Sequence, residues 1–549
     1  MQAIIPRTIK LIPAYLLLAC LTTWPAAVRI GSAVPGAGRT DIWNSLWSIW
    51  FAQYNFALKG LSLDTTLISF PRGGRLLVAD PLASVLVGPL IPFLGVSVSY
   101  TLLVLGQLVL AGVVAHRLVE DILASRGEVR PGAGWIAGVA FATAPVLLAG
   151  IHNGTSESFS GGWTALAVWM AWRAACSGGI GRVLIAALCV VLGSVASWYS
   201  AMNIFLFLGA MLLLSPTGGW RGHLGARLGV IIVSLVLVAP LAYAVHHTAI
   251  HPDNLVSIKN VRELMGIRRS TGPADILGFF APFDFRSPDF RTLSRYGEEF
   301  FHCHYLGVVL IIGALCARRR GPGWLWMGGL LAGVLAMGPV LVRNGMPLII
   351  FTDRAIPLPY FLFEGLPGFG SLSLLYRLTL GLSLALAILA GIGLSGKRWW
   401  LVVGLILIEG RLVSPMGGLP GVSDATISPA LVALEDAPHG AVMNFPVAGG
   451  RGYLYEQTVH RKPVTDTLNF PNNLASRKVW QAMLDHGEDT PEDFTAYVGS
   501  VARREGVRYL VVHDDEEARP DMHDMAVRSV RAAYAPLEDA DGVQVFQLW

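Results

Sequence analysis

Residues 11–28, which read LIPAYLLLACLTTWPAAV, form a run of 18 residues without a charged side chain. Such a run can cross the ~30 Å hydrocarbon core of a bilayer as one helix. Three further charge-free runs lie at 133–151, 228–245 and 378–396, and shorter apolar runs lie at 158–172, 305–317, 321–342 and 399–408. The run at 183–215 is broken by polar residues near its middle and predicts a hairpin of two spans. The chain is therefore expected to be a bundle of membrane-spanning helices.

The composition excludes several other classes of protein. Of the 549 residues, 53% are hydrophobic and only 14% are charged, whereas soluble domains have about 25% charged residues. Too few charges are present to cover the surface of a soluble enzyme of this size, so a soluble globule, a disordered chain and a nucleic-acid-binding protein are all excluded. The five cysteines are scattered without metal-ligand spacing. They predict neither a disulfide scaffold nor a zinc site.

Charge divides the chain into two parts. Residues 424–549 contain 20 acidic and 11 basic side chains, whereas residues 1–423 contain 17 acidic and 30 basic ones. The acidic part alternates short apolar segments with polar helical ones, which is typical of an α/β domain. We expect a transmembrane domain over 1–423 and a small soluble α/β domain over 424–549. The basic excess of the first part suits membrane orientation and phosphate binding better than nucleic-acid binding.

The apolar stretch at 81–115 decides the topology. It is long for one span and short for two, and Pro81, Pro89 and Pro92 crowd its first half, so we expect one crossing with a broken or re-entrant first half. About eleven spans result. The short loops rich in Lys and Arg then share one side, which the positive-inside rule makes the cytoplasm; they contain Arg7, Lys10, Arg117, Arg126, Arg130, Arg173, Arg182, Arg221, Arg227, Arg318, Arg319, Arg320, Lys397 and Arg398. The N-terminus is predicted to be cytoplasmic and the C-terminal domain extracytoplasmic, in a plasma (inner) membrane.

Four segments face outward on this topology, at 29–80, 152–157, 247–304 and 343–376. The first contains Asp41, followed by aromatic residues at helical spacing over 43–58. This pattern predicts an amphipathic helix in the headgroup layer with Asp41 at its N-cap. Asp41 is then either a functional carboxylate or only a cap, and the spacing leaves both open. Arg72, Arg75 and Asp80 close the segment.

The other outward segments also contain candidate site residues. His152 and Glu157 belong to a tight polar turn between two apolar spans, where ionisable groups usually face a cavity. Glu298, Glu299, His302 and His304 could bind a metal, although their spacing matches no specific zinc signature and substrate contact is the alternative. Arg377 stands at the outer mouth of a span, where its planar fork suits a phosphate and where it could also snorkel to lipid headgroups.

With these residues in place, the first 420 residues or so resemble the GT-C class of membrane glycosyltransferases, which use polyprenyl-phosphate-linked sugars. The similar features are an N-terminal span, an outward loop with Asp41, a basic and aromatic segment ending in Asp80-Pro81-Leu82, a short polar outward loop, a large outward loop after the seventh span and an outward soluble tail. The Asp-Glu pair of protein mannosyltransferases is absent after the first span, which puts a protein acceptor in doubt.

The resemblance implies a mechanism and a set of partners. Asp41 would be the base, and Arg72, Arg75 and Arg377 would hold the donor phosphate. Asp80 and Glu157, with His152, Glu298 and His302 as further candidates, would orient the acceptor or a divalent cation such as Mg²⁺ or Mn²⁺. The sugar would pass with inversion from a polyprenyl phosphate to an envelope glycan or glycolipid at the outer face of the bilayer. A transporter or lipid flippase, and an inactive relative that acts in envelope assembly, are the alternatives.

Overall fold

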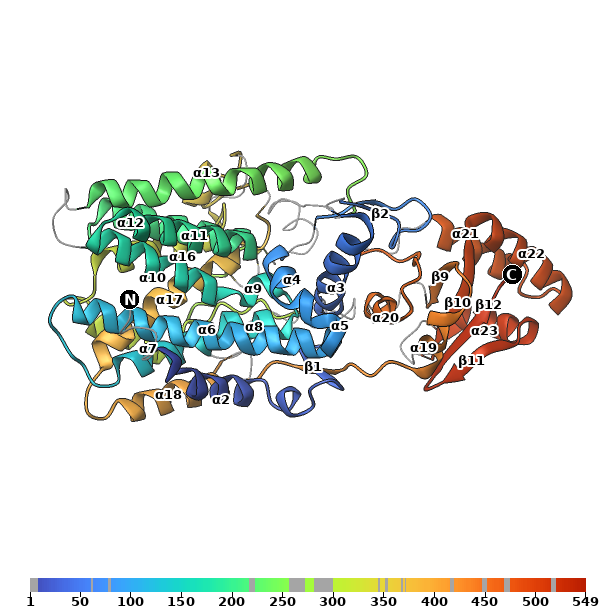
Figure 1. Cartoon of the computed structure of the whole chain (residues 1–549), viewed down its shortest axis with the longest axis horizontal. Coiled ribbons are helices and arrows are strands. Elements are labelled where there is room, and N and C mark those ends of the chain that lie inside the picture. The colour runs from blue at the N-terminus through green and yellow to red at the C-terminus, as the bar shows by residue number, and fades with distance from the viewer. Residues whose placement is uncertain are drawn as a thin grey trace.

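The computed structural model describes residues 8–60, 63–77, 80–216, 223–255, 272–280, 300–343, 346–350, 354–366, 369–370, 372–414, 419–446, 452–468, 474–514 and 520–549. The molecule is elongated, with a bundle of nearly parallel helices at one end and a small α/β domain at the other (Figure 1). We call the end of the bundle next to this domain the domain end, and the opposite one the far end.

The bundle helices run back and forth between these two ends. They are α2 (Ile12–Thr22), α6 (Val96–Ala124), α7 (Ala133–Ala142), α8 (Pro145–His152), α10 (Gly161–Ser177), α11 (Ile180–Ala196), α12 (Trp198–Leu213), α13 (Leu224–Ala249), α15 (Val308–Cys316), α16 (Gly323–Ala336), α17 (Thr379–Leu394) and α18 (Trp399–Leu412). Four described helical segments are long and apolar enough to cross a membrane, namely 96–124, 133–152, 224–249 and 375–394, and several shorter apolar helices accompany them. The number of eleven crossings stays a prediction.

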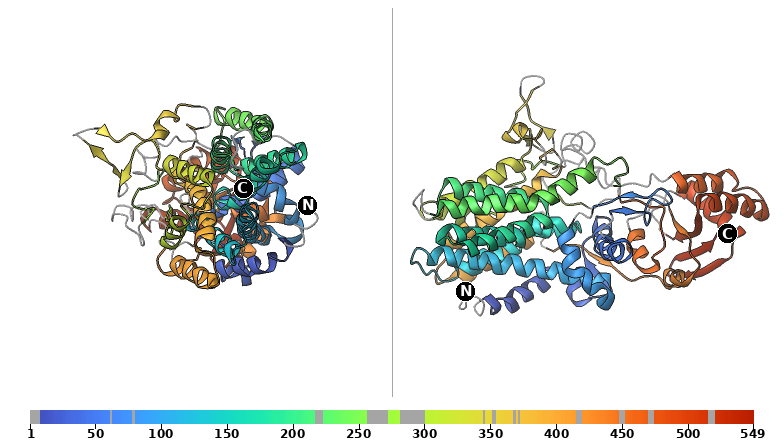
Figure 2. Two further views of the ribbon diagram at one scale, coloured as in Figure 1. Left: turned by 90° about the vertical axis from the view of Figure 1, so that its left-hand side faces the viewer. Right: turned by 45° about the horizontal axis from the view of Figure 1, so that its top comes forward.

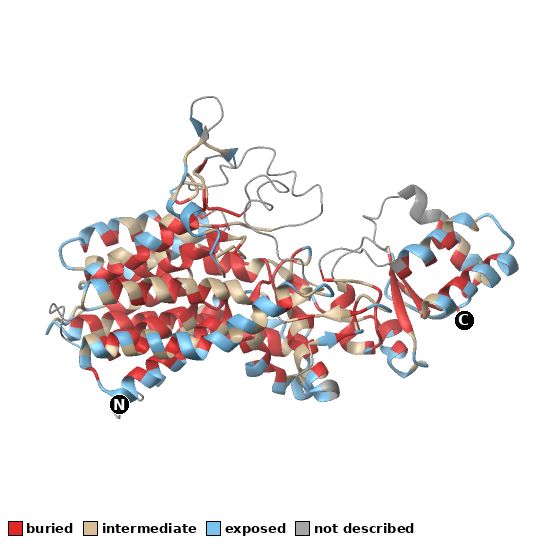
Figure 3. Cartoon of the chain, turned by 90° about the horizontal axis from the view of Figure 1, so that it is seen from above, coloured by how far each residue is buried: buried red, intermediate tan, exposed pale blue. Residues whose placement is uncertain are grey.

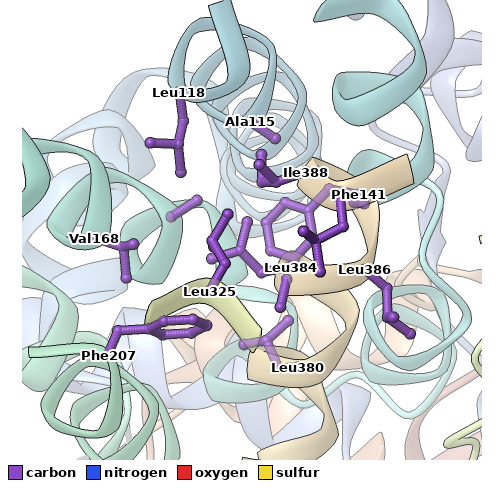
Figure 4. Packing of buried hydrophobic residues seen from close by; sticks show 14 of the residues in the cluster. Ala115, Leu118, Phe141, Val168, Phe207, Leu325, Leu380, Leu384, Leu386 and Ile388 are labelled. Carbon is purple, nitrogen blue, oxygen red and sulfur yellow. The ribbon is translucent and has the colours of Figure 1, made fainter. Parts of the chain in front are cut away.

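Burial separates the centre of the bundle from its lipid-facing rim. The helical segment 375–394 includes α17, and 83% of an 18-residue apolar stretch within it is buried. In the corresponding stretch of α13 only 17% is buried. Leu380, Leu384 and Ile388 of α17 pack against Phe141 and Leu325 of neighbouring helices (Figure 4). The outer faces of the bundle remain exposed and apolar (Figure 3), as expected where lipid replaces water as the solvent.

The basic loops gather at the far end of the bundle. The guanidinium of Arg126 donates to the carbonyl of Arg320, and the Gly396 N–H donates to the carbonyl of Pro131 at 3.0 Å. The segment 126–131 therefore contacts two other loops that were predicted to lie on the same side of the membrane. Which side of the membrane they face stays a prediction.

The proline-rich half of 81–115 is broken as predicted. It forms α4 (Pro81–Val87), a 3₁₀ turn (η2, Gly88–Leu90) and α5 (Ile91–Leu94), and Gly95, with φ of 79°, then leads into the long helix α6. Each of the three prolines stands in the first turn of its piece, where a missing N–H costs no hydrogen bond. The break leaves α4 across the domain end of the bundle (Figure 1).

The aromatic segment forms helix α3 (Ile42–Lys59), whose aromatic face is buried against protein, while its place in the headgroup layer stays a prediction. Trp47 is fully buried and donates from Nε1 to Oε1 of Gln457 at 2.6 Å, and Trp43 stacks on Tyr455. Both partners belong to α20 (Gly452–His460) of the C-terminal part. The aromatic face of α3 thus meets protein instead of lipid, and α3 joins the bundle to the α/β domain.

The C-terminal part contains a four-stranded sheet of order β11 (Pro536–Ala540), β12 (Val543–Gln547), β10 (Val507–His513) and β9 (Ala441–Phe445). Strands β9 and β10 are parallel and the other pairs are antiparallel. Side chains alternate along β10: Leu510 and Val512 pack towards α21 (Leu474–Asp485), α22 (Pro491–Glu505) and α23 (Pro520–Ala533). Tyr509 and Val511 pack towards α19 (Pro429–Asp436) and α20. Strands and helices thus alternate here, as the sequence pattern predicted, and β8 (Val422–Asp424) pairs with β1 (Ala33–Pro35).

Candidate functional site

The polar turn at 152–157 lies directly against the start of α3 at the domain end. The Ala37 N–H donates to the carbonyl of His152 at 2.8 Å, and the Asp41 N–H donates to the carbonyl of Asn153 at 3.1 Å. Gly154 has φ of 65°, and a Cβ built on it would lie 2.2 Å from the Cα of Ile42. This close contact, which only glycine permits, brings the carboxylate-bearing turn to the N-terminus of α3.

Asp41 occupies the N-cap position of α3, but its side chain does not cap the helix. No hydrogen bond runs from the first-turn backbone to its carboxylate; instead Asn44 donates from Nδ2 to Oδ1 of Asp41 at 3.0 Å. The side chain is half-buried at the N-terminus of the helix. The reading of Asp41 as a mere cap is therefore not supported by the geometry.

Asp80 is buried at the N-cap of α4, with 4% of its surface exposed. Its Oδ1 accepts from the Ala83 N–H at 2.8 Å. Burial raises the pKa of this carboxyl to about 7, with hydrogen bonds from Ala83 and Ser156 opposing the shift and the nearby Glu157 charge adding to it. Asp80 and Glu157 therefore form one electrostatically coupled pair.

Arg377 completes this group from the 3₁₀ turn η6 (Leu375–Leu378) that leads into α17. Its Nη1 donates to Oε1 of Glu157. The guanidinium carbon lies 5.2 Å from the ring centre of Tyr199, whose hydroxyl accepts from the Leu374 N–H at 2.9 Å. The Arg377 side chain is only 6% exposed, and within the described chain its Nε–H has no hydrogen-bond partner. A buried guanidinium with an unused N–H can donate a charge-assisted hydrogen bond to a bound anion.

The segment that follows the large outward loop also reaches the turn. Asn153 donates to the Phe301 carbonyl at 2.7 Å and accepts from the Phe301 N–H at 2.8 Å. The ring of His302 packs edge-on against Tyr376 at 4.9 Å between ring centres. His152 accepts at Nδ1 from the Gly421 N–H at 2.9 Å, so this imidazole is a structural link to the C-terminal part.

Two predicted phosphate ligands belong to a different part of the structure. Arg75 forms an ion pair with Asp64 at 3.0 Å across the hairpin of β2 (Asp64–Thr65) and β3 (Gly74–Arg75), and the exposed Arg72 forms one with Asp253 at 3.2 Å. The structure shows no contact between this hairpin and the group around Arg377 within the described residues. Arg72 and Arg75 therefore do not belong to the group of residues around Arg377, and their role in binding the donor phosphate stays a prediction.

The described residues do not fit a divalent cation. No group of three or more His, Cys, Asp or Glu side chains comes close enough to form a metal site in the described ranges. Asp80 already accepts a backbone hydrogen bond, and Glu157 is paired with Arg377. Glu298 and Glu299 lie outside the described residues. Mg²⁺ or Mn²⁺ stays a prediction, and no step proposed below uses it.

Asn44 and Tyr199 are members of the site that sequence patterns did not single out as functional. Asn44 follows Asp41 by one helical turn, a spacing that could have identified it as a partner. Tyr199 lies in the polar break of the 183–215 hairpin, and only the fold reveals that it meets Arg377.

Gly154→Ala should lower the turnover of the site by about 10-fold or more, because a 1 Å displacement can cost that much in a positioned site. The added methyl would push the turn away from Ile42 and weaken the hydrogen bond from the Asp41 N–H to the Asn153 carbonyl. Steady-state kinetics of the purified variant would measure the effect.

Gly127→Ala is the matched control, since Gly127 has a similar φ of 69° but open space around its Cβ position. An alanine with positive φ is strained, and this strain is similar in the two variants. Equal turnover in the two variants would show that the contact at Gly154 does not set the site geometry.

The comparisons with known proteins agree with this architecture. No protein-family model matches the chain, and no curated protein matches it. Among solved structures, the arabinofuranosyltransferase AftD from Mycobacteria is similar over 99% of this chain, with a TM-score of 0.53 and 16% identity. The chain spans about 40% of the length of AftD. ArnT from Cupriavidus metallidurans (TM-score 0.45, 12% identity, 100% of this chain and 98% of ArnT) and the oligosaccharyltransferase AglB from Archaeoglobus fulgidus (0.43, 12%, 92% and 69%) are more distant.

These neighbours are GT-C glycosyltransferases, and the likeness to AftD shows that the chain has the GT-C fold predicted from its sequence. At 16% identity the likeness establishes the fold alone.

Proposed function

We propose that this chain is an integral-membrane glycosyltransferase that moves a sugar from a polyprenyl phosphate to a hydroxyl of an envelope glycan or glycolipid. The observation that supports this proposal is the buried side chain of Arg377 at the domain end, where Asp41 also lies. It donates to Glu157, and its Nε–H has no partner among the residues that the structure describes. The GT-C fold supports the same chemistry.

In this reaction Arg377 acts on the leaving group and Asp41 acts on the nucleophile. The oxygen of the acceptor hydroxyl forms a bond to the anomeric carbon while the bond from that carbon to the phosphate oxygen breaks. The phosphate leaves with the electron pair, and Arg377 stabilises its charge through a planar, bidentate fork. The acceptor proton passes to the Asp41 carboxylate, which Asn44 orients. Attack opposite to the leaving group inverts the configuration at the sugar carbon.

Asp80 and Glu157 act around this reaction without transferring its proton. Glu157 holds Arg377 in place, and a phosphate that binds to the guanidinium competes with this carboxylate. The buried Asp80 stands next to Glu157 and, with its pKa raised to about 7 by burial, can be protonated without loss of its backbone contacts. We assign both residues to positioning the acceptor and Arg377.

The proposal requires the domain end to be extracytoplasmic. A single cysteine in place of Ser500, exposed in the α/β domain, should react with a membrane-impermeant maleimide in cells stripped of their outer barrier. One in place of Ser177, exposed at the far end, should react only after permeabilisation. A background without the five native cysteines is needed. Labelling at position 177 but not at 500 in intact cells would reverse the orientation and remove the basis for an outer-face donor.

A further inference from the structure

A small β structure projects sideways from the bundle between α16 and α17. Strand β4 (Val342–Arg343) pairs with β5 (Met346–Pro347), and β6 (Ile349–Ile350) pairs with β7 (Arg354–Ala355). Leu341 connects the two pairs, accepting from the Leu348 N–H at 2.8 Å and donating to the Ile356 carbonyl at 3.0 Å. Both views in Figure 2 show these strands standing clear of the helices and of the α/β domain. We call the described residues of 340–366 the apolar wing.

The surface of the apolar wing is unusually hydrophobic for an outward loop. Met346 is 56% exposed, Ile349 59% and Leu362 76%, and Ile350 and Leu366 are also exposed. Single exposed apolar residues need no explanation, but several on one small element mark an interaction surface. Covering this surface with an apolar partner would be favourable, because it removes apolar side chains from water.

The position of the apolar wing indicates that its partner is the lipid bilayer. It begins after α16, whose residues Leu330 (56% exposed) and Leu331 (40% exposed) belong to the outer, lipid-facing surface of the bundle. It projects sideways from the bundle and not along its axis towards the α/β domain (Figure 2). Its apolar side chains therefore continue the surface that meets acyl chains.

Two features limit how deep the apolar wing can lie. Its short strands have open edges, and unpaired backbone groups are not tolerated in the hydrocarbon core but can bind water or headgroups. Arg343 is exposed on β4, and its charge favours the phosphate level of the bilayer. The boundary between headgroups and acyl chains satisfies both the apolar side chains and the polar backbone.

We propose that the apolar wing inserts into the leaflet at the domain end and rests at the headgroup boundary. Tyr360 is the buried part of the apolar wing, and its hydroxyl donates to the carbonyl of Phe369, after which the chain leads to Leu374 and Arg377. Insertion of the wing thereby fixes the depth of Arg377 relative to the lipid phosphates. The insertion itself does not depend on the proposed activity.

Spin-label accessibility in phosphatidylcholine/phosphatidylglycerol nanodiscs tests the proposal. Labels are placed on Ile349→Cys and Leu362→Cys in a chain without the five native cysteines. Two positions of similar exposure serve as references: Val432 in the α/β domain, 48% exposed, and Leu235 on α13, 53% exposed. All four residues are exposed, so their replacement should not unfold the protein, which thermal unfolding would verify.

Labels at 349 and 362 should be relaxed more by oxygen than by a water-soluble nickel chelate, with a depth between that of position 235 and that of position 432. Aqueous accessibility equal to that of 432 at both positions would overturn the proposal. Exclusion of both relaxants would also overturn it, since it would show that the apolar wing packs against protein.

Discussion

Asp41→Asn should lower turnover by about 100-fold or more, the usual scale for loss of a general base. Asparagine has nearly the same shape and keeps the contact with Asn44 within reach, but it cannot accept the proton of the acceptor hydroxyl. Because the Asp41 carboxylate caps no backbone N–H of α3, the substitution should leave thermal stability nearly unchanged. Steady-state kinetics and thermal unfolding of the same preparation measure both effects.

Asp64→Asn is the matched control for Asp41→Asn. Asp64 is an exposed carboxylate of the same outward segment, and its partner is Arg75. Its replacement should leave turnover unchanged. If Asp41→Asn retained wild-type turnover, the base would have to be sought at Asp80 or Glu157.

Arg377→Lys should weaken donor binding by ~1–3 kcal/mol, the range for a charge-assisted hydrogen bond. Lysine keeps the charge, but it loses both the fork that bonds two phosphate oxygens and the flat contact with the Tyr199 ring. The dissociation constant of a polyprenyl phosphate, measured with the protein in nanodiscs, would rise accordingly. Catalysis need not occur for this measurement.

Arg72→Lys is the matched control for Arg377→Lys, because it shows whether an arginine that only contacts lipid headgroups also affects donor binding. Arg72 is also predicted to be outward, but its side chain is 79% exposed and paired with Asp253. Donor affinity should stay at the wild-type value in this variant. Equal losses in both Lys variants would mean that neither arginine holds the phosphate specifically.

The sequence predicted those features that local patterns encode. The charge-free runs fall on bundle helices. The three prolines divide the first half of 81–115 into short pieces, and each proline lies in the first turn of its piece. Charge counting assigned the basic loops to one side, and the contact between Arg126 and Arg320 shows that two of these loops meet. The same topology placed Asp41, Asp80, Glu157 and Arg377 at one end.

Contacts between residues far apart in the chain were beyond prediction. The spacing of Trp43 and Trp47 shows an apolar helix face, but a lipid layer and a protein surface select the same spacing, and only the fold shows α20 beneath it. Arg72 and Asp253 are 181 residues apart, so no local pattern reveals that this arginine is already paired. The outward loop at 343–376 was expected from topology alone, and its apolar wing appeared only in the structure.

The central claim is that the group around Asp41 and Arg377 transfers a sugar from a lipid phosphate. Its most direct test incubates the purified protein in nanodiscs with total membrane lipids of the cells that make it and measures free polyprenyl phosphate by mass spectrometry. Wild-type protein should release polyprenyl phosphate, and Asp41→Asn should release about 100-fold less. Equal release by wild-type and Asp41→Asn protein, or none by either, would contradict it.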